Sequence, residues 1–295
     1  MTTSEAPGPE RPSASASQGP AGFGARVGRD LGPRVISGVF IASVALAAIL
    51  AGSYIWAIAV ALVVGIAAWE WGRIVRGGGA DPALVSHVVT AVAAVLLTST
   101  GNRGWALLLV FVGSAEMLWS SRTRHPVLSA AGVLATGLPA VALVWLRDDA
   151  TFGTVAVLFV VTAVAMTDIG AYFSGRLIGG PKLWPRISPN KTWAGLGGGM
   201  IAAALVGAIV ANTVSGAATS HLMLLGALLA VVAQAGDLAE SALKRRFGVK
   251  DASQLIPGHG GVMDRIDGLA TASLLAAVWG LCFNSAAPAQ ALLTW

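Results

Sequence analysis

Long apolar runs alternate with short polar connections along most of the chain after residue 35. A helix needs about 20 mostly apolar residues to cross a bilayer. Nine runs approach that length, at residues 36–52, 54–72, 84–100, 104–119, 127–146, 152–174, 193–213, 221–243 and 266–284. Backbone polar groups in hydrocarbon must be paired, and these runs lack the alternation of a membrane barrel. The pattern therefore predicts an all-α fold, a polytopic transmembrane bundle of about nine spans.

The composition supports a membrane protein and argues against nucleic-acid binding. Hydrophobic residues make up 55% of the chain and charged residues 11%, and the mean hydropathy is +0.74. The net charge is +5, but the cations sit in short loops between apolar runs, not on a basic domain face. The single cysteine, Cys282, excludes a disulfide framework and a cysteine-based metal site.

The distribution of cations predicts the orientation of the bundle. With the N-terminus in the cytoplasm and nine spans, the C-terminus lies outside. All but two of the 19 Lys and Arg residues, Arg103 and Arg147, then face the cytoplasm. Positive charge marks cytoplasmic loops, so this orientation is strongly favoured over its reverse.

The chain divides into a short tail and one membrane-embedded domain. Residues 1–24 are rich in Ser, Ala, Pro and Gly, which is typical of a disordered tail. Residues 25–295 then form one membrane-embedded domain, in which no repeat of 20–50 residues is evident.

Three acidic residues within apolar runs are candidates whose role the sequence leaves open. Asp168 lies in a helix about two turns before Arg176, where a carboxylate is costly unless it faces a cavity or finds a partner. An ion pair with a neighbouring helix and a functional role are both compatible with that position. Glu70 and Glu116 lie close enough to span ends to reach water or a cation.

Two pairs of acidic residues flank the last cytoplasmic loop. Asp237 and Glu240 near the end of one run, and Asp264 and Asp267 at the start of the next, each share a helix face at i,i+3 spacing. Adjacent helices can bring these faces together. Converging aspartates beside clustered Lys and Arg are typical of a site that holds a hard divalent cation and phosphate oxygens.

Two loops add cations and glycines to this picture. The loop GGPKLWPRISPNKTWAG presents Lys182, Arg186 and Lys191 on a backbone stiffened by three prolines, although basic cytoplasmic loops also follow from topology alone. The segment IPGHGG places glycines around His259, which permits close approach to a phosphate group. A role for His259 in stabilising the turn fits its glycine neighbours equally well.

The segment SALKRRFGVKDASQLIPGHGGVMDRID, from Ser241 to Asp267, resembles the signature of the phosphatidate cytidylyltransferases, also called CDP-diacylglycerol synthases. The segment TDIGAYFSGRLIGGPKLWPRISPNKTWAG at residues 167–195 is similar to that family too. The resemblance is sharp over residues 165–268 and general before them. It implies a multi-pass cell-membrane enzyme, with its active site facing the cytoplasm, that makes CDP-diacylglycerol and pyrophosphate from CTP and phosphatidic acid with Mg²⁺.

The resemblance also implies roles for particular residues. It places a paired metal centre, Mg²⁺ with a second cation, at Asp237 and Asp264, and we expect Asp267 to support or orient these ligands. The reaction needs neutralisation of charge, and we expect cations and polar groups to hold the triphosphate and the lipid phosphate. The expected residues are Lys182, Ser188, Lys191, Lys244, Arg245, Lys250, His259 and Arg265. Glycine-rich helices and the resemblance together suggest a homodimer.

Other functions remain as alternatives at this point. A transporter would place Asp168, Asp237 and Glu240 along an ion path, but no inverted repeat is visible and the polar residues cluster at one membrane face. Enzymes that move a phosphoalcohol on CDP-diacylglycerol carry a D-G-x-x-A-R pattern, and DRIDGLATA lacks its arginine. CTP-dependent enzymes that act on polyprenol phosphates share some of the layout.

Overall fold

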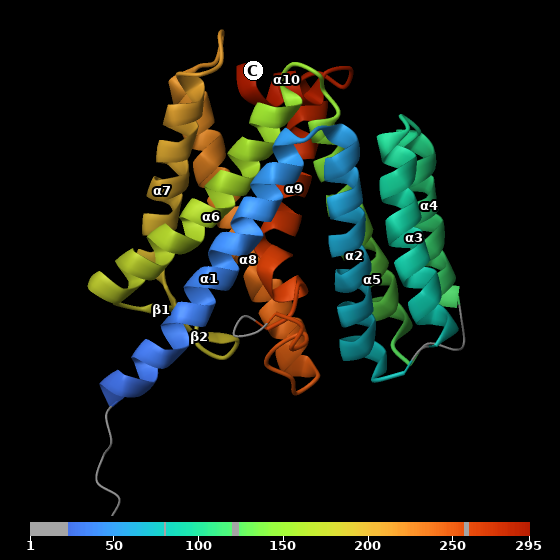
Figure 1. Cartoon of the computed structure of the whole chain (residues 1–295), viewed down its shortest axis with the longest axis horizontal. Coiled ribbons are helices and arrows are strands. Elements are labelled where there is room, and N and C mark those ends of the chain that lie inside the picture. Colours follow the sequence, from blue (N-terminus) through green and yellow to red (C-terminus); the bar gives the residue numbers. More distant parts are fainter. Residues whose placement is uncertain (1–22, 80, 120–123, 257–259) are drawn as a thin grey trace, which may run out of the picture.

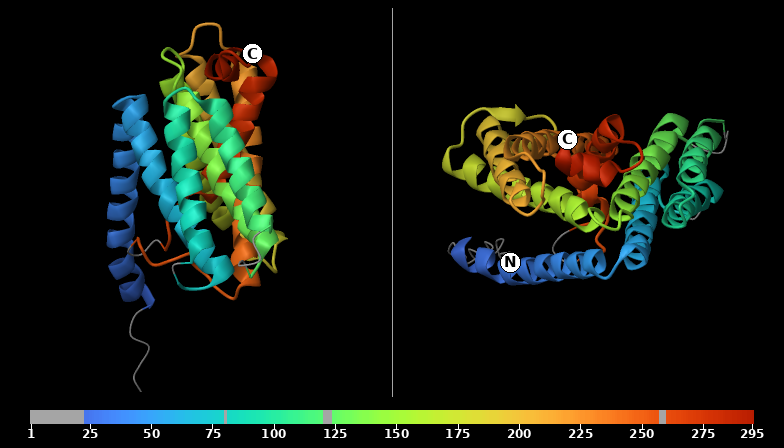
Figure 2. Two further views of the ribbon diagram at one scale, coloured as in Figure 1. Left: turned by 90° about the vertical axis from the view of Figure 1, so that its right-hand side faces the viewer. Right: turned by 90° about the horizontal axis from the view of Figure 1, so that it is seen from above.

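The computed structural model describes residues 23–79, 81–119, 124–256 and 260–295, with side chains from residue 37 onward. Nearly all of the predicted tail, residues 1–24, lies outside the described residues. Ten helices and one short β-hairpin form the described chain. The long helices stand side by side and run up and down in turn (Figures 1 and 2). The predicted all-α polytopic bundle is confirmed.

The bounds of most long helices follow the predicted runs, but the first helix begins at Phe23 and not at residue 36, and the last short helix was not predicted. The helices are α1 (Phe23–Leu50), α2 (Ser53–Arg76), α3 (Pro82–Ser99), α4 (Arg103–Trp119), α5 (Pro126–Arg147), α6 (Gly153–Leu177), α7 (Trp193–Ala211), α8 (Thr219–Arg246), α9 (Met263–Phe283) and α10 (Pro288–Thr294). The strands are β1 (Lys182–Trp184) and β2 (Ser188–Thr192), between α6 and α7.

Seven of the described helices are long and apolar enough to cross a membrane: α2, α3 and α5 to α9. The other two predicted runs are helical but shorter. The apolar part of α1 with described side chains is Ser37–Leu50, and α4 has 17 residues. Seven of the nine predicted runs therefore have the length and composition of a membrane span, and the count of nine spans stays a prediction.

The basic loop after α6 forms a β-hairpin that the sequence did not predict. Strands β1 and β2 pair antiparallel, with Lys182 opposite Thr192 and Trp184 opposite Ser188. Proline cannot donate to a strand ladder, so a loop with prolines at 181, 185 and 189 does not show strand periodicity. The hairpin leads the chain from the end of α6 into the start of α7 (Figure 1). Its cations therefore lie at the end of the bundle where α6 ends and α7 begins.

Glycines allow α6, α7 and α8 to pack backbone to backbone. A Cβ atom at Gly170 of α6 would lie 2.7 Å from the carbonyl oxygen of Gly198 in α7. A Cβ at Gly207 of α7 would collide with the backbone of Leu222 in α8. Small residues at such positions let helices approach closely in lipid. Close approach is what brings the hairpin after α6 against the last turns of α8.

The cations of the described chain divide unequally between the two ends of the bundle. Because helices alternate in direction, α2, α6 and α8 end where α3, α7 and α9 begin (Figure 1). Most described Lys and Arg residues lie at that end, which we call the basic end. Arg103 and Arg147 lie at the opposite end, where Arg103 pairs with Asp148 at 2.6 Å and Arg147 Nε donates to the carbonyl of Ile49 at 2.9 Å.

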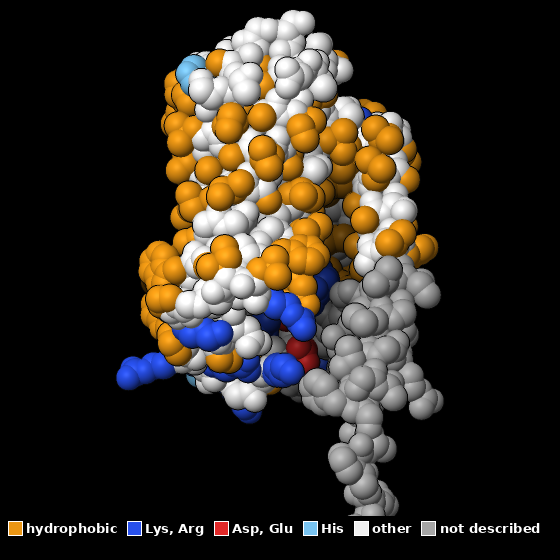
Figure 3. Space-filling model, turned by 90° about the vertical axis from the view of Figure 1, so that its left-hand side faces the viewer, with side chains coloured by type: hydrophobic (Ala, Val, Ile, Leu, Met, Phe, Trp, Pro, Cys, Tyr) orange, Lys and Arg blue, Asp and Glu red, His pale blue; other side chains and the backbone are white. Residues whose placement is uncertain are grey.

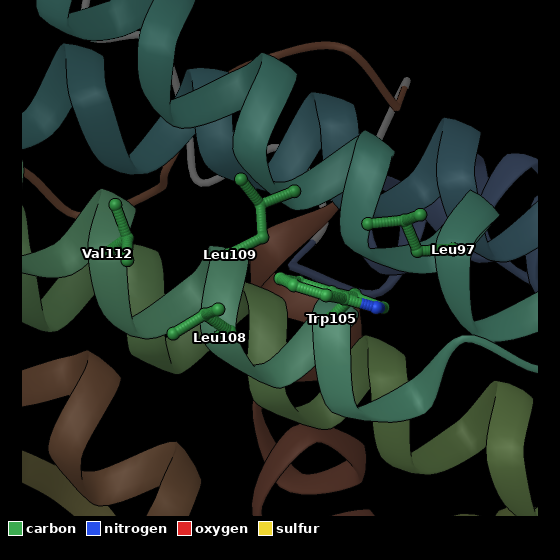
Figure 4. A pocket seen from close by; sticks show the side chains of 5 residues that line it. All are labelled: Leu97, Trp105, Leu108, Leu109 and Val112. Atoms are coloured by element: carbon green, nitrogen blue, oxygen red, sulfur yellow. The ribbon is translucent and has the colours of Figure 1, made fainter.

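The outer surface carries an apolar groove that is distinct from the polar end. It has a volume of about 360 Å³ and lies between α3 and α4, lined by Leu97, Trp105, Leu108, Leu109 and Val112 (Figure 4). These side chains offer no charge to a nucleotide. The groove is therefore suited to contact with lipid chains.

We expect Gly207→Ala to destabilise the protein because the added methyl group meets the backbone of Leu222, and overpacking costs about 1–3 kcal/mol. Gly197→Ala is the matched control, since it lies on the same helix and a Cβ there meets nothing within 4 Å. Thermal unfolding of both variants in detergent measures the difference. Equal melting temperatures for the two variants would contradict the close packing of α7 and α8.

Candidate active site

Four of the aspartates that the sequence singled out come from three helices and lie at the basic end. Asp168 lies in α6, Asp237 in α8, and Asp264 and Asp267 in the first two turns of α9. Figure 3 shows Asp or Glu side chains surrounded by Lys and Arg at this end of the molecule, below a broad apolar surface. Segments far apart in the sequence thus contribute to one charged region.

Lys191 connects the hairpin to α8. Its Nζ atom lies 2.6 Å from Asp237 Oδ2 and donates a hydrogen bond to Gln234 Oε1 at 2.7 Å. Gln234 Nε2 in turn donates to Asp168 Oδ1 at 3.3 Å. The side chain of Thr192, the next residue, caps the N-terminus of α7 and so fixes the end of the hairpin. One chain of polar contacts therefore joins α6, the hairpin and α8.

Lys244 makes the second connection, between α8 and α9. Its Nζ atom lies 3.0 Å from Glu240 Oε1 and 2.5 Å from Asp264 Oδ1. The other oxygen of Asp264 accepts hydrogen bonds from the backbone N–H groups of Ala252 at 3.0 Å and Gly261 at 2.7 Å. Removing one partner of such an enclosed pair typically costs about 3–5 kcal/mol. This pair holds the start of α9 against α8.

Three carboxylates near these pairs influence one another electrostatically. Asp267 interacts electrostatically with both Asp237 and Asp168, and Asp168 also interacts with Asp237. Asp267 Oδ1 accepts a hydrogen bond from the N–H group of Gly268. Like charges that interact repel one another unless positive charge lies among them. Lys191 supplies part of that charge, and a bound cation would supply more.

Exposure distinguishes the two aspartates that the sequence predicts as metal ligands. The side chain of Asp237 is 32% exposed, whereas that of Asp264 is 6% exposed. Asp237 can thus meet a ligand from solution directly. Asp264 is enclosed, and its oxygens contact Lys244 and two backbone N–H groups.

The other residues that the sequence predicts for substrate lie at the basic end or outside the described chain. Lys182, Arg245, Lys250 and Arg265 are exposed, and Ser188 is half-buried. Arg265 interacts electrostatically with Asp168. His259 lies outside the described residues.

Sequence reasoning missed Gln234 and left three acidic residues open. Gln234 is a buried polar residue in an apolar run, three positions before Asp237, and that spacing was the available signal. Asp168 is part of the site, and Glu70 contacts the loop between α8 and α9. Glu116 lies elsewhere, in α4, and accepts a hydrogen bond from Ser86 of α3 at 2.5 Å.

Comparisons with known proteins agree with this arrangement. A model of the cytidylyltransferase family matches residues 32–283, which include α2 as well as α6 to α9. The phosphatidate cytidylyltransferase of Brucella suis biovar 1 is 44% identical over 201 residues, which cover 66% of this chain and 72% of the relative.

Two further relatives extend the similarity over more of the chain. The phosphatidate cytidylyltransferase of Haemophilus influenzae is 34% identical over 275 residues, covering 81% of this chain and 94% of the relative. The phosphatidate cytidylyltransferase of Mycobacterium bovis is 30% identical over 286 residues, which cover 90% of this chain and 94% of the relative. The chain therefore belongs to the cytidylyltransferase family, in which these relatives are phosphatidate cytidylyltransferases, and the resemblance seen in the sequence is confirmed.

Proposed function

We propose that this protein transfers the cytidylyl group of CTP to phosphatidic acid, giving CDP-diacylglycerol and pyrophosphate for phospholipid biosynthesis. The observation that carries the proposal is the pairing of Lys191 with Asp237 and of Lys244 with Asp264 at one end of a membrane bundle. A lipid phosphate at the membrane surface and a nucleotide from solution can both reach such an end. The names of the relatives support the same reaction.

The proposed chemistry is an in-line displacement at phosphorus. An oxygen of the lipid phosphate forms a bond to the α-phosphorus of CTP, and the bond from that phosphorus to the β-phosphate oxygen breaks. The lipid phosphate is already anionic, so the reaction needs no strong general base. Alignment and neutralisation of charge are what the protein has to supply.

The carboxylates of the site suit a hard divalent cation. Mg²⁺ takes oxygen ligands and usually combines one or two carboxylates with phosphate oxygens and water. Within the described ranges, no group of three or more His, Cys, Asp or Glu side chains forms a ready-made metal shell. Substrate phosphates would therefore complete the coordination.

We propose Asp237 and Asp264 as the metal ligands, with Asp267 in support and with a second cation beside Mg²⁺. A bound cation would supply positive charge to the phosphates as pyrophosphate leaves. The mutual electrostatic interaction of Asp237 with Asp168 and Asp267 supports a cation at Asp237. It also makes Asp168 a neighbour of that cation.

The cations around the carboxylates would hold the phosphates. Lys191 and Lys244 are fixed by their carboxylate partners and lie next to the proposed metal ligands. Other polar residues that the sequence predicts would contact a triphosphate or a lipid phosphate in solution or at the interface. We propose that role for Lys182, Ser188, Arg245, Lys250, His259 and Arg265.

We propose that the basic end faces the cytoplasm and that α1 and α4 complete nine spans. The alternation of helix directions in Figure 1 and the concentration of cations at one end support this orientation through the positive-inside rule. The N-terminus would then lie in the cytoplasm and the C-terminus outside. A homodimer stays a prediction.

The first test is CDP-diacylglycerol formation from phosphatidic acid and labelled CTP by purified protein, with and without Mg²⁺. We expect product only with Mg²⁺, and a loss of at least about a hundredfold in Asp237→Asn and Asp264→Asn, because each change removes a carboxylate that would hold the cation. Asp148→Asn is the matched control, since Asp148 forms an ion pair of equal 2.6 Å length at the opposite end. Near-normal activity of Asp264→Asn at saturating Mg²⁺ would refute its assignment as a metal ligand.

Lys191→Ala should raise the KM for CTP by about tenfold or more, because it removes a charge-assisted contact to phosphate. Arg186→Ala removes an exposed cation from the same hairpin and serves as the control. Steady-state kinetics with each substrate varied in turn gives the KM for CTP and the KM for phosphatidic acid separately. An unchanged KM for both substrates in Lys191→Ala would remove the hairpin from the site.

Cysteine labelling tests the orientation. In a Cys282→Ser background, we expect Ser285→Cys to react with a membrane-impermeant maleimide in intact cells, because Ser285 lies after α9 at the opposite end from the site. Arg186→Cys should react only after the membrane is permeabilised. The reverse pattern of labelling would show that the basic end faces outward.

A further inference from the structure

Glu70 is a fully buried carboxylate in the apolar helix α2, and its side chain has an exposed fraction of 0%. A buried carboxylate is costly unless hydrogen bonds or opposite charge compensate it. Glu70 lies in the first half of the chain, which otherwise contributes little to the site. Its partners are therefore informative.

Those partners all belong to the loop between α8 and α9 or to the start of α9. Glu70 Oε1 accepts hydrogen bonds from Ser253 Oγ at 2.5 Å and from the N–H group of Val262 at 3.0 Å. Glu70 Oε2 accepts one from the N–H group of Met263 at 2.6 Å. The side-chain carboxylate thus has three donors from a segment more than 180 residues away.

The contacts make Glu70 the N-terminal cap of α9. A helix start leaves backbone N–H groups without partners, and a carboxylate there also interacts favourably with the helix dipole. Val262, at the N-cap position of α9, makes no side-chain cap hydrogen bond. The cap is supplied instead by α2, from another part of the fold.

Glu70 and Asp264 together hold both sides of the loop. Asp264 accepts from the N–H groups of Ala252 and Gly261, while Glu70 accepts from the adjacent residues Ser253 and Val262. Two neighbouring carboxylates therefore fix the segment before α9. Since one of them is a proposed metal ligand, the position of Glu70 affects the position of that ligand.

The surrounding packing leaves Glu70 little freedom. A Cβ atom at Gly261 would lie 2.6 Å from Glu70 Oε1, so only glycine fits beside the carboxylate. One turn further along α2, Ile74 and Val75 form an apolar cluster with Leu243 of α8 and Met263 of α9. The contact between α2 and α9 is thus both polar and apolar.

We infer that Glu70 is a positioning residue for the reaction: by capping α9 from α2, it sets the place of Asp264 and Arg265 relative to the lysines of α8 and the hairpin. The kinetic consequence of this inference rests on the proposed function. The capping itself is tested independently of activity. The three hydrogen bonds of Glu70 all come from protein groups.

Three variants test this role. Glu70→Gln keeps the shape of the side chain but replaces an acceptor oxygen with an NH₂ group, which cannot accept from the N–H groups of α9. Ser253→Ala removes one of the three hydrogen bonds and leaves the cap intact. Glu116→Gln is the matched control, because Glu116 of α4 also accepts a short hydrogen bond from a serine, but that serine belongs to α3 and not to the loop before α9.

Hydrogen exchange of peptides that cover residues 249–256 and 260–270 reports the capping. We expect faster exchange in Glu70→Gln, a smaller increase in Ser253→Ala and none in Glu116→Gln. The KM for CTP should rise at least about tenfold in Glu70→Gln, since small misplacements of binding groups cost that much. We expect the same order of variants in both measurements.

Two results would overturn the inference. Unchanged exchange in Glu70→Gln would show that Glu70 does not cap α9. Faster exchange with an unchanged KM for CTP would show that Glu70 has only a structural role. A lower yield of folded enzyme with normal kinetics per folded molecule would show the same. If the wild-type protein forms no CDP-diacylglycerol, the proposed function fails, and the exchange measurement still decides whether Glu70 caps α9.

Discussion

The cost of placing carboxylates in an apolar bundle shapes the whole basic end of this protein. Each buried or half-buried acid there is compensated by a lysine or by backbone N–H groups. Asp237 is compensated by Lys191, Asp264 by Lys244 and two N–H groups, and Glu70 by the start of α9. Because an uncompensated carboxylate is so unfavourable in this setting, these contacts specify how the loops pack onto the helices.

Close helix packing makes those contacts reachable. Glycines in α6, α7 and α8 allow backbone-to-backbone approach, so Lys191 at the end of β2 comes within hydrogen-bonding distance of Asp237 in α8. Bulkier residues at these positions would separate the helices and lengthen every polar contact between them. The apolar interior and the charged end therefore depend on the same small residues.

The structure also joins the two halves of the chain. The recognisable motif lies between residues 241 and 267, yet one of the side chains that orders it, Glu70, belongs to α2. A helix that would otherwise serve only as a membrane span thus becomes part of the scaffold of the site. Its contacts give a physical reason for the first half to be present in a protein whose chemistry lies in the second.

The sequence by itself determined the membrane class, most of the helix positions, the gathering of cations at one end and the family. Long apolar runs and a motif of fixed spacing are local features, so they can be recognised without knowledge of the fold. Only the tertiary structure decided that the loop with Lys191 is a hairpin, that Gln234 joins Asp168 to Lys191, and that Glu70 caps α9. These are contacts between segments distant in the chain, and they depend on which helices are neighbours and how closely those helices pack. Periodicity along one segment does not encode either property.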